Sequence, residues 1–214
     1  MKNGNAVLFD CDGVLVNACA IHREALRQAV VEFGFADEYY EFMIPSLEGR
    51  PTKVKLELLR AGQSKSPPIT DEQLNYIADR KQEITKVMLA NLQPDPDKVA
   101  LLSKLAAEGI LIAVASNSLK ASLTIMLDRT GLLDLVQYHV GNDEVPAPKP
   151  APDLYLKAAS ELGLLMNECV IVEDSDVGMA SATAAHPKGI IRVQGPHEVH
   201  LGLIERIQHI FGEA

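Results

Sequence analysis

Long apolar runs are missing from this chain of 214 residues. No stretch approaches the roughly 20 apolar residues of a membrane-spanning helix, so we expect no membrane partner. The first residues lead straight into a short apolar segment, without the hydrophobic region of a signal peptide. The sequence therefore predicts a cytoplasmic protein.

Cysteine and positive charge are also scarce. Cys11, Cys19 and Cys169 have no metal-like spacing and are odd in number, which indicates reduced thiols. The net charge of -9 argues against general binding to nucleic acid, because phosphate backbones attract basic surfaces. It does not exclude a small phosphorylated metabolite as ligand, since a local site can have the opposite sign. We expect a monomer or a weak homodimer.

Two aspartates end the first apolar segment. Asp10 and Asp12 follow the strand-like residues 7–9, and Gly13 would let the backbone turn sharply there. In a strand, residues i and i+2 point the same way, and two like charges aimed at one spot raise each other's pKa. Such a pair suits a metal, a shared proton, or a nucleophile beside an acid–base group. The simpler alternative is a turn with two solvated acids.

Further along the chain, short apolar segments alternate with helical patterns. The strand candidates are residues 110–115, 135–140, 170–172 and 190–193. The helical patterns between them cover residues 97–107, 118–130 and 151–162. This alternation predicts an α/β fold, a Rossmann-like doubly wound parallel sheet covered on both faces. Ligands of such sheets bind at the carboxyl ends of the strands.

Residues 17–92 interrupt this alternation with helical patterns alone. Thr70 and Gln73 have the spacing of a capping box, and the helix that follows is expected to bury Leu74, Ile77 and Ile84. We therefore predict two domains. Residues 1–16 and 93–214 would form a Rossmann-like catalytic core, and residues 17–92 an inserted all-helical cap.

Polar residues gather where three of the predicted strands end. They are Asp10, Asp12, Ser116, Asn117, Glu173 and Asp174, and Lys149 lies on a proline-rich loop before the last two. Each group alone is explained by helix capping or by a solvated surface charge. Together, four carboxylates beside one lysine need a cation, and oxygen ligands select a hard ion such as Mg²⁺. The lysine, the serine hydroxyl and backbone N–H groups would suit a phosphate.

These motifs, in this order, resemble those of the haloacid dehalogenase-like phosphohydrolase superfamily, in particular its β-phosphoglucomutase and phosphatase branch with a helical cap. The matching segments are Asp10-Cys11-Asp12-Gly13-Val14-Leu15, Ser116-Asn117-Ser118, Lys149-Pro150 with Pro152-Asp153, and Glu173-Asp174-Ser175 with Gly178. Since they span residues 10–178, the resemblance covers nearly the whole chain.

The resemblance implies a nucleophile, an acid–base group and a metal site. Asp10 would take the phosphoryl group as an aspartyl-phosphate. Asp12 would protonate the leaving oxygen and later deprotonate water. The Asp10 side chain, the Asp12 backbone carbonyl and Asp174 would hold Mg²⁺, with Glu173 bound directly or through water.

The resemblance also implies a phosphate site. Ser116, Asn117 and Lys149 would bind the phosphoryl oxygens. Three departures from the family pattern are visible, and one of them is a loop variation at residues 185–189, before the last strand. Asn17 stands at the cap hinge, where the family usually has an acidic residue, and Ser181 stands where it often has alanine. We expect the change at the hinge to leave the chemistry intact. Serine is also small, so we expect helix packing to be retained.

The cap is expected to select the substrate. His22 lies on the first predicted cap helix, and Gly49, Arg50 and Lys53 lie where the family has a specificity loop. Arg50 or Lys53 would bind a hydroxyl or carboxylate of the substrate. The alternative is that these side chains are simply solvated, as most surface charges are.

The sequence thus predicts a Mg²⁺-dependent phosphatase that hydrolyses a small phosphorylated metabolite, such as a sugar phosphate, through an aspartyl-phosphate. A phosphosugar mutase shares these motifs and stays open as an alternative. A catalytically silent binding module is disfavoured because Asp10, Asp12, Lys149 and Asp174 are all present. Dehalogenase chemistry is disfavoured because that branch lacks the second aspartate of the first motif.

Overall fold

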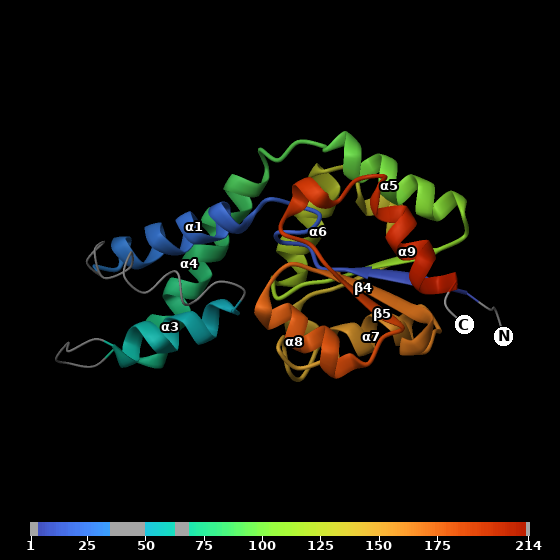
Figure 1. The fold of residues 1–214 in the computed structure, drawn as a ribbon. Helices are drawn as coiled ribbons and strands as arrows, with labels where there is room; N and C mark the ends of the chain where they lie inside the picture. Colours follow the sequence, from blue (N-terminus) through green and yellow to red (C-terminus); the bar gives the residue numbers. More distant parts are fainter. Residues whose placement is uncertain (1–3, 35–49, 63–68, 213–214) are drawn as a thin grey trace. The chain divides into compact units, whose positions relative to one another are not determined.

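The computed structural model describes residues 4–34, 50–62 and 69–212. The chain divides into two compact units, which are described separately (Figure 1). The first, called here the sheet unit, comprises Met1–Asn17 and Leu92–Ala214. The second, called here the helical unit, comprises Ala18–Asn91.

The described part of the sheet unit contains a five-stranded sheet in the order β3-β2-β1-β4-β5, and every pair in it is parallel. The strands are β1 (Ala6–Phe9), β2 (Leu111–Ala115), β3 (Tyr138–Val140), β4 (Cys169–Glu173) and β5 (Gly189–Arg192). The central strand β1 is fully buried along its length. Both of its faces are covered, which explains why it is apolar throughout. The predicted parallel sheet is confirmed.

The weakest predicted strand, residues 135–140, is shorter than expected. It pairs with β2 only over Tyr138–Val140, because Leu133–Leu135 forms a 3-10 helix. Next to that helix, a side chain provides one of the hydrogen bonds to β2. Oε1 of Gln137 accepts the N–H of Ile112 at 2.7 Å.

Helices cover both faces of the sheet (Figure 1). On one face lie α7 (Asp153–Glu161) and α8 (Asp176–Ala185), whose Leu154, Ala158 and Ala182 share a buried cluster with Leu8 and Ile171. On the other face lie α5 (Pro96–Ala107), α6 (Lys120–Arg129) and α9 (Leu203–Gly212). This layering is the doubly wound arrangement that the alternating pattern predicts.

The chain reverses its direction across the sheet beside β1. Strands β2 and β3 extend from one side of β1, and β4 and β5 extend from the other. Ligands in such sheets bind outside the carboxyl ends of the strands at this reversal. Phe9 pairs with Val172, so the residues that follow them, Asp10 and Glu173, stand level at that edge.

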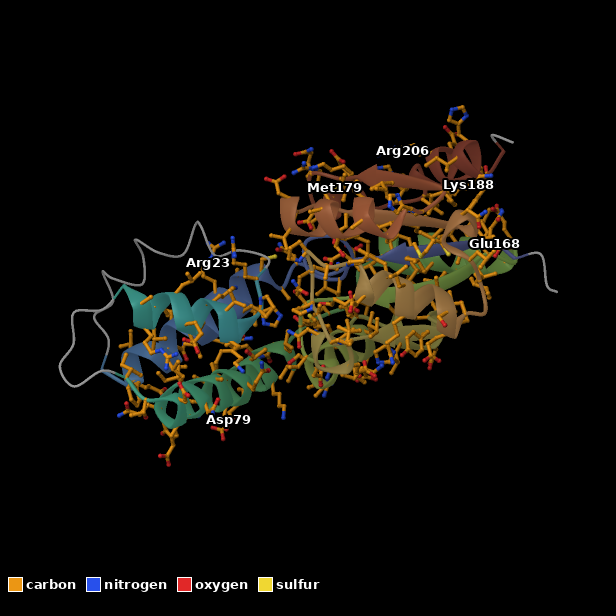
Figure 2. The ribbon with its side chains drawn as sticks, turned by 90° about the horizontal axis from the view of Figure 1, so that it is seen from below. Arg23, Asp79, Glu168, Met179, Lys188 and Arg206 are labelled. Carbon is orange, nitrogen blue, oxygen red and sulfur yellow. The ribbon has the colours of Figure 1, made fainter. Side chains whose placement is uncertain are left out.

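The helical unit packs α1 (Cys19–Glu32), α3 (Thr52–Ala61) and α4 (Asp71–Leu89) around its own apolar core. Polar side chains such as Arg23 and Asp79 point away from this core (Figure 2). The predicted capping box starts α4. Thr70 Oγ1 accepts the N–H of Gln73 at 3.3 Å, and Gln73 Oε1 accepts the N–H of Thr70 at 2.9 Å. None of the helices described in either unit has the length and apolar character needed to cross a membrane.

Candidate active site

The segment after β1 turns sharply instead of continuing as a strand. Backbone hydrogen bonds to the carbonyl of Cys11 close this turn. Gly13 has a φ of +92° and lies so close to Asp174 that an added Cβ would stand 2.1 Å from its Oδ2. The strand alternation invoked for Asp10 and Asp12 therefore does not apply, because the turn places them.

A buried cluster lies at the carboxyl ends of β1 and β4. The Lys149 ammonium donates to Oδ1 of Asp10 and to Oε1 of Glu173, both at 2.6 Å. It also donates to the hydroxyl of Tyr155 at 2.8 Å, and this hydroxyl donates to Oε1 of Glu173 at 2.8 Å. Asp10, Lys149 and Glu173 are 7%, 4% and 0% exposed. Each of the three N–H bonds of the ammonium thus has a partner inside the protein.

The cluster holds more negative than positive charge. Burial raises the pKa of Asp10 well above its usual value, and the attraction of Lys149 offsets this only in part. For Glu173 burial opposes ionisation, but Lys149 prevails and the pKa is lowered. Burial, followed by the charge of Glu173, raises the pKa of Asp174 to about 6. An added cation would relieve this excess of carboxylates.

Three acids of the cluster could hold a metal ion. Asp10, Glu173 and Asp174 each offer a carboxylate oxygen, and these oxygens lie within 4.8 Å of one another. Among the described residues, Oδ1 of Asp174 is buried without a hydrogen-bond partner, although buried polar atoms normally have one. An oxygen-only donor set with an unsatisfied oxygen fits a hard cation such as Mg²⁺.

The two carboxylate oxygens of Glu173 have different surroundings. Its Oε1 lies against Lys149 and Tyr155, whereas Oε2 accepts the backbone N–H groups of Asp174 at 3.0 Å and Ser175 at 3.3 Å. The fold therefore holds this carboxylate firmly on both sides. Its burial and its five donors, which include the Ser175 hydroxyl at 3.3 Å, make it a support for the lysine as well as a candidate ligand.

The polar residues after β2 make hydrogen bonds within the protein. Ser116 Oγ accepts the N–H of Ser118 at 3.0 Å, which stabilises a local turn and does not cap α6. Ser118 Oγ donates to Oδ2 of Asp12 at 2.9 Å. The carboxamide of Asn117 binds the backbone of Lys149, accepting its N–H at 2.9 Å and donating to its carbonyl at 3.2 Å.

The predicted substrate residues belong to the helical unit. His22 is half-buried, and its Nδ1 lies 3.3 Å from Nζ of Lys81. Arg50 and Lys53 are exposed. Gly49 lies outside the described residues.

Two buried polar residues, Tyr155 and Lys81, are not among the site residues predicted from the sequence. Nothing in the sequence distinguishes Tyr155 from an aromatic residue of the core, although a buried tyrosine hydroxyl normally needs a partner. The spacing of Lys81 within its helix does indicate that it is buried. It follows Ile77 by four residues and precedes Ile84 by three, so it lies in the apolar stripe of α4 and is only 6% exposed.

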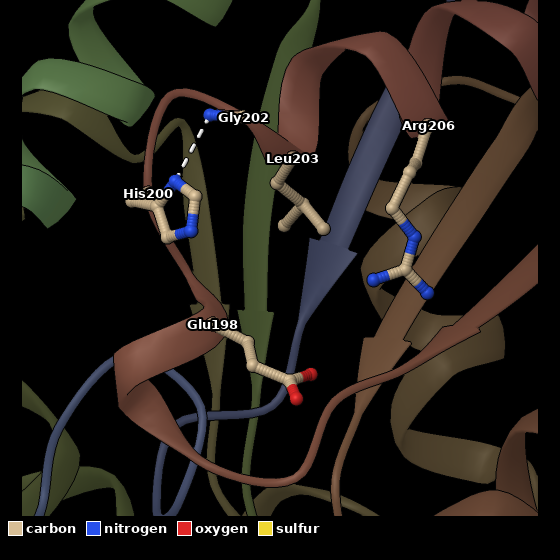
Figure 3. A pocket seen from close by; sticks show the side chains of 5 residues that line it. All are labelled: Glu198, His200, Gly202, Leu203 and Arg206. Carbon is tan, nitrogen blue, oxygen red and sulfur yellow. Dashed lines mark hydrogen bonds between the residues drawn. The ribbon is translucent and has the colours of Figure 1, made fainter.

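A separate pocket of about 250 Å³ lies beside the start of α9, lined by Glu198, His200, Gly202, Leu203 and Arg206 (Figure 3). Its polar side chains bind nearby backbone. Nδ1 of His200 accepts the N–H of Gly202 at 3.1 Å, and Arg206 donates to a carbonyl of β5 at 3.3 Å. None of the motif residues lines this pocket, so we place the candidate active site at the buried cluster.

Residues 7–191 match the family of haloacid dehalogenase-like hydrolases, and the chain belongs to this family. It is 28% identical over 181 residues to the fructose-1-phosphate phosphatase of Escherichia coli, covering 84% of this chain and 91% of that protein. It is also 28% identical over 193 residues to the phosphorylated carbohydrates phosphatase of Thermotoga maritima, covering 89% and 84%.

A solved structure supports the fold. The β-phosphoglucomutase of Clostridium difficile aligns with a TM-score of 0.81 over 98% of both chains, at 20% identity. This likeness confirms the predicted α/β architecture, and the family match over residues 7–191 confirms the predicted superfamily.

Proposed function

We propose that this protein is a Mg²⁺-dependent phosphatase that hydrolyses a small phosphorylated metabolite, with sugar phosphates as the substrate class. The observation that carries the proposal is the buried cluster of Asp10, Lys149 and Glu173 at the strand-order reversal, where the ammonium lies 2.6 Å from an oxygen of each carboxylate. The names of the two phosphatase relatives support the substrate class.

Asp10 is the proposed nucleophile. Lys149 holds its Oδ1, and an oxygen of this carboxylate attacks the phosphorus. A bond forms between phosphorus and Asp10 as the ester P–O bond breaks, and the leaving oxygen takes a proton from Asp12. Water then attacks the aspartyl-phosphate and gives a proton to Asp12. Orthophosphate leaves, and the Asp10 carboxylate is restored.

Positive charge is required around the transferred group. We assign a Mg²⁺ site to the carboxylates of Asp10 and Asp174 and the backbone carbonyl of Asp12, with Glu173 bound directly or through water. When bound, this ion would neutralise phosphoryl charge and favour in-line displacement. Lys149 supplies a second positive charge, since its ammonium contacts Oδ1 of Asp10 at 2.6 Å.

Other residues would bind the rest of the substrate. The hydroxyl of Ser116 accepts the N–H of Ser118, which leaves its O–H to donate to a phosphoryl oxygen. We assign substrate selection to His22, Arg50 and Lys53 of the helical unit. The buried Lys81 orients the imidazole of His22.

The test is phosphate release from a panel of phosphorylated metabolites. We expect release that EDTA stops and Mg²⁺ restores, and we expect Asp10→Asn to remain folded and inactive. The matched control is Asp176→Asn, which removes an exposed carboxylate that binds Arg192 at 2.7 Å and should retain activity. Substantial turnover by Asp10→Asn, or full turnover without a metal, contradicts the proposal.

The same assay distinguishes a mutase. The protein is incubated with a hexose 1-phosphate and a bisphosphate activator, and the products are separated. A hydrolase releases free phosphate. An isomeric sugar phosphate without free phosphate would replace the hydrolase proposal by the mutase alternative.

A further inference from the structure

The loop that carries Lys149 has few backbone donors. Pro148, Pro150 and Pro152 have no N–H group, so Lys149 and Ala151 carry the only N–H groups of residues 148–152. The N–H of Ala151 binds the carbonyl of Pro148 at 3.0 Å, within the loop. The N–H of Lys149 is therefore the one backbone donor with which this loop can bind the rest of the fold.

Asn117, two residues after the end of β2, binds this donor and the neighbouring carbonyl. Its Oδ1 accepts the N–H of Lys149 at 2.9 Å, and its Nδ2 donates to the carbonyl of Lys149 at 3.2 Å. A carboxamide offers an acceptor and a donor side by side, as a neighbouring strand does. A carboxylate has no donor, and a hydroxyl is too short to span both groups.

Ser181 holds the same loop from α8. Its Oγ donates to the carbonyl of Ala151 at 2.7 Å, and the residue is fully buried. The two side chains therefore fix the backbone on either side of Pro150. This hydrogen bond is absent when alanine occupies position 181, the residue expected from the family pattern.

We propose that the side chain of Asn117 positions Lys149 and does not bind the phosphoryl group itself. By fixing the Lys149 backbone, it sets where the flexible side chain begins, so that the ammonium reaches Asp10 and Glu173 at 2.6 Å. Ser181 supports the loop in the same way. The inference rests on the proposed phosphatase function, because it assigns how the lysine of that site is held.

A double-mutant cycle tests this assignment. The dissociation constant of orthophosphate in Mg²⁺ buffer is measured by calorimetry for the wild type, Asn117→Ala, Lys149→Met and the double variant. We expect Asn117→Ala to weaken binding about tenfold in the otherwise wild-type protein, because the displaced ammonium attracts the bound phosphate less strongly. In the Lys149→Met background it should have no further effect. Equal losses in both backgrounds would mean direct contact with phosphate and would overturn the proposal.

If Lys149→Met binds orthophosphate too weakly to measure, crystal structures of the variants test the role of Asn117 instead. In Asn117→Ala, the Lys149 ammonium should leave its position beside Asp10. The matched control is Gln137→Ala, which removes a carboxamide that bonds the backbone of Ile112 at 2.7 Å, at the other end of β2. That variant should leave both the ammonium and phosphate binding unchanged. An unmoved ammonium in Asn117→Ala, together with weakened phosphate binding, overturns the proposal. Asn117→Thr takes its place in both measurements if the alanine variant does not fold.

Ser181→Ala is a second test of the proposal. It should weaken orthophosphate binding about threefold, a smaller loss because the hydrogen bond is neutral and two residues from Lys149. Thr183→Ala on the same helix removes a hydroxyl that donates to Met179 at 2.8 Å and should change nothing. Unchanged binding in Ser181→Ala removes this residue from the proposal. A wild type that hydrolyses no phosphate ester refutes the proposed function, while the ammonium position in the Asn117→Ala crystals still decides the positioning role.

Discussion

Replacing Gly178 by alanine should disturb the buried cluster, although Gly178 itself has no catalytic role. An added Cβ would stand 1.8 Å from Oε1 of Glu173 and 2.0 Å from its Cδ. These distances are far too short for atoms that are not bonded, so the carboxylate or α8 must move. Because the same Oε1 accepts from Lys149 and Tyr155, a displaced carboxylate loses these hydrogen bonds.

Two opposing effects set the change in the free energy of unfolding of Gly178→Ala. Alanine in place of glycine stabilises a helix by about 1 kcal/mol. Breaking a buried ion pair costs roughly 3–5 kcal/mol, because a buried charge loses its partner. The free energy of unfolding of Gly178→Ala should therefore fall by about 2–4 kcal/mol. For a chain of this size, that lowers the melting temperature by roughly 5–15 °C.

Thermal unfolding followed by circular dichroism, with phosphate release measured on the same samples, checks this result. The matched control is Gly212→Ala at the end of α9, where an added Cβ meets nothing within 4 Å, and it should melt within about 2 °C of the wild type. A Gly178→Ala variant that melts with the wild type and keeps its phosphatase activity would refute the reasoning from the clash.

Three further predictions follow from the contacts. Tyr155→Phe removes the hydroxyl between Lys149 and Glu173 and should lower the free energy of unfolding by about 1–3 kcal/mol in urea titrations; an unchanged midpoint contradicts the bridging role. Lowering the pH from about 7.5 to about 5 protonates Asp174, whose pKa is raised to about 6, and should weaken Mg²⁺ binding about tenfold by calorimetry; the same drop in Asp174→Asn would assign the effect elsewhere. Thr70→Ala removes the side chain that caps α4 and should lower the free energy of unfolding by about 1 kcal/mol in urea titrations, whereas Thr70→Ser should leave it unchanged.

The sequence alone predicts the sheet and the edge at which the cluster lies. Residues 7–9 and 170–172 are apolar without alternation, as expected for strands covered on both faces. Parallel strands bring their carboxyl ends to one edge, and Asp10 lies directly after the first of them while Glu173 ends the other. Local order along the chain is therefore enough to place both acids. It is not enough to orient Asp12, because a turn replaces the strand there.

Only the tertiary structure decides what each polar side chain binds. Lys149 has the sequence context of a surface charge, yet folding buries it between two acids. Asn117 is as suitable for a phosphate as for a backbone, and it binds Lys149 because the adjacent prolines leave that N–H without a partner in its own loop. Tyr155 has the pattern of a core residue, although its hydroxyl joins the cluster. Hydrogen-bond partners depend on distances between segments that are remote in the chain, and packing sets those distances.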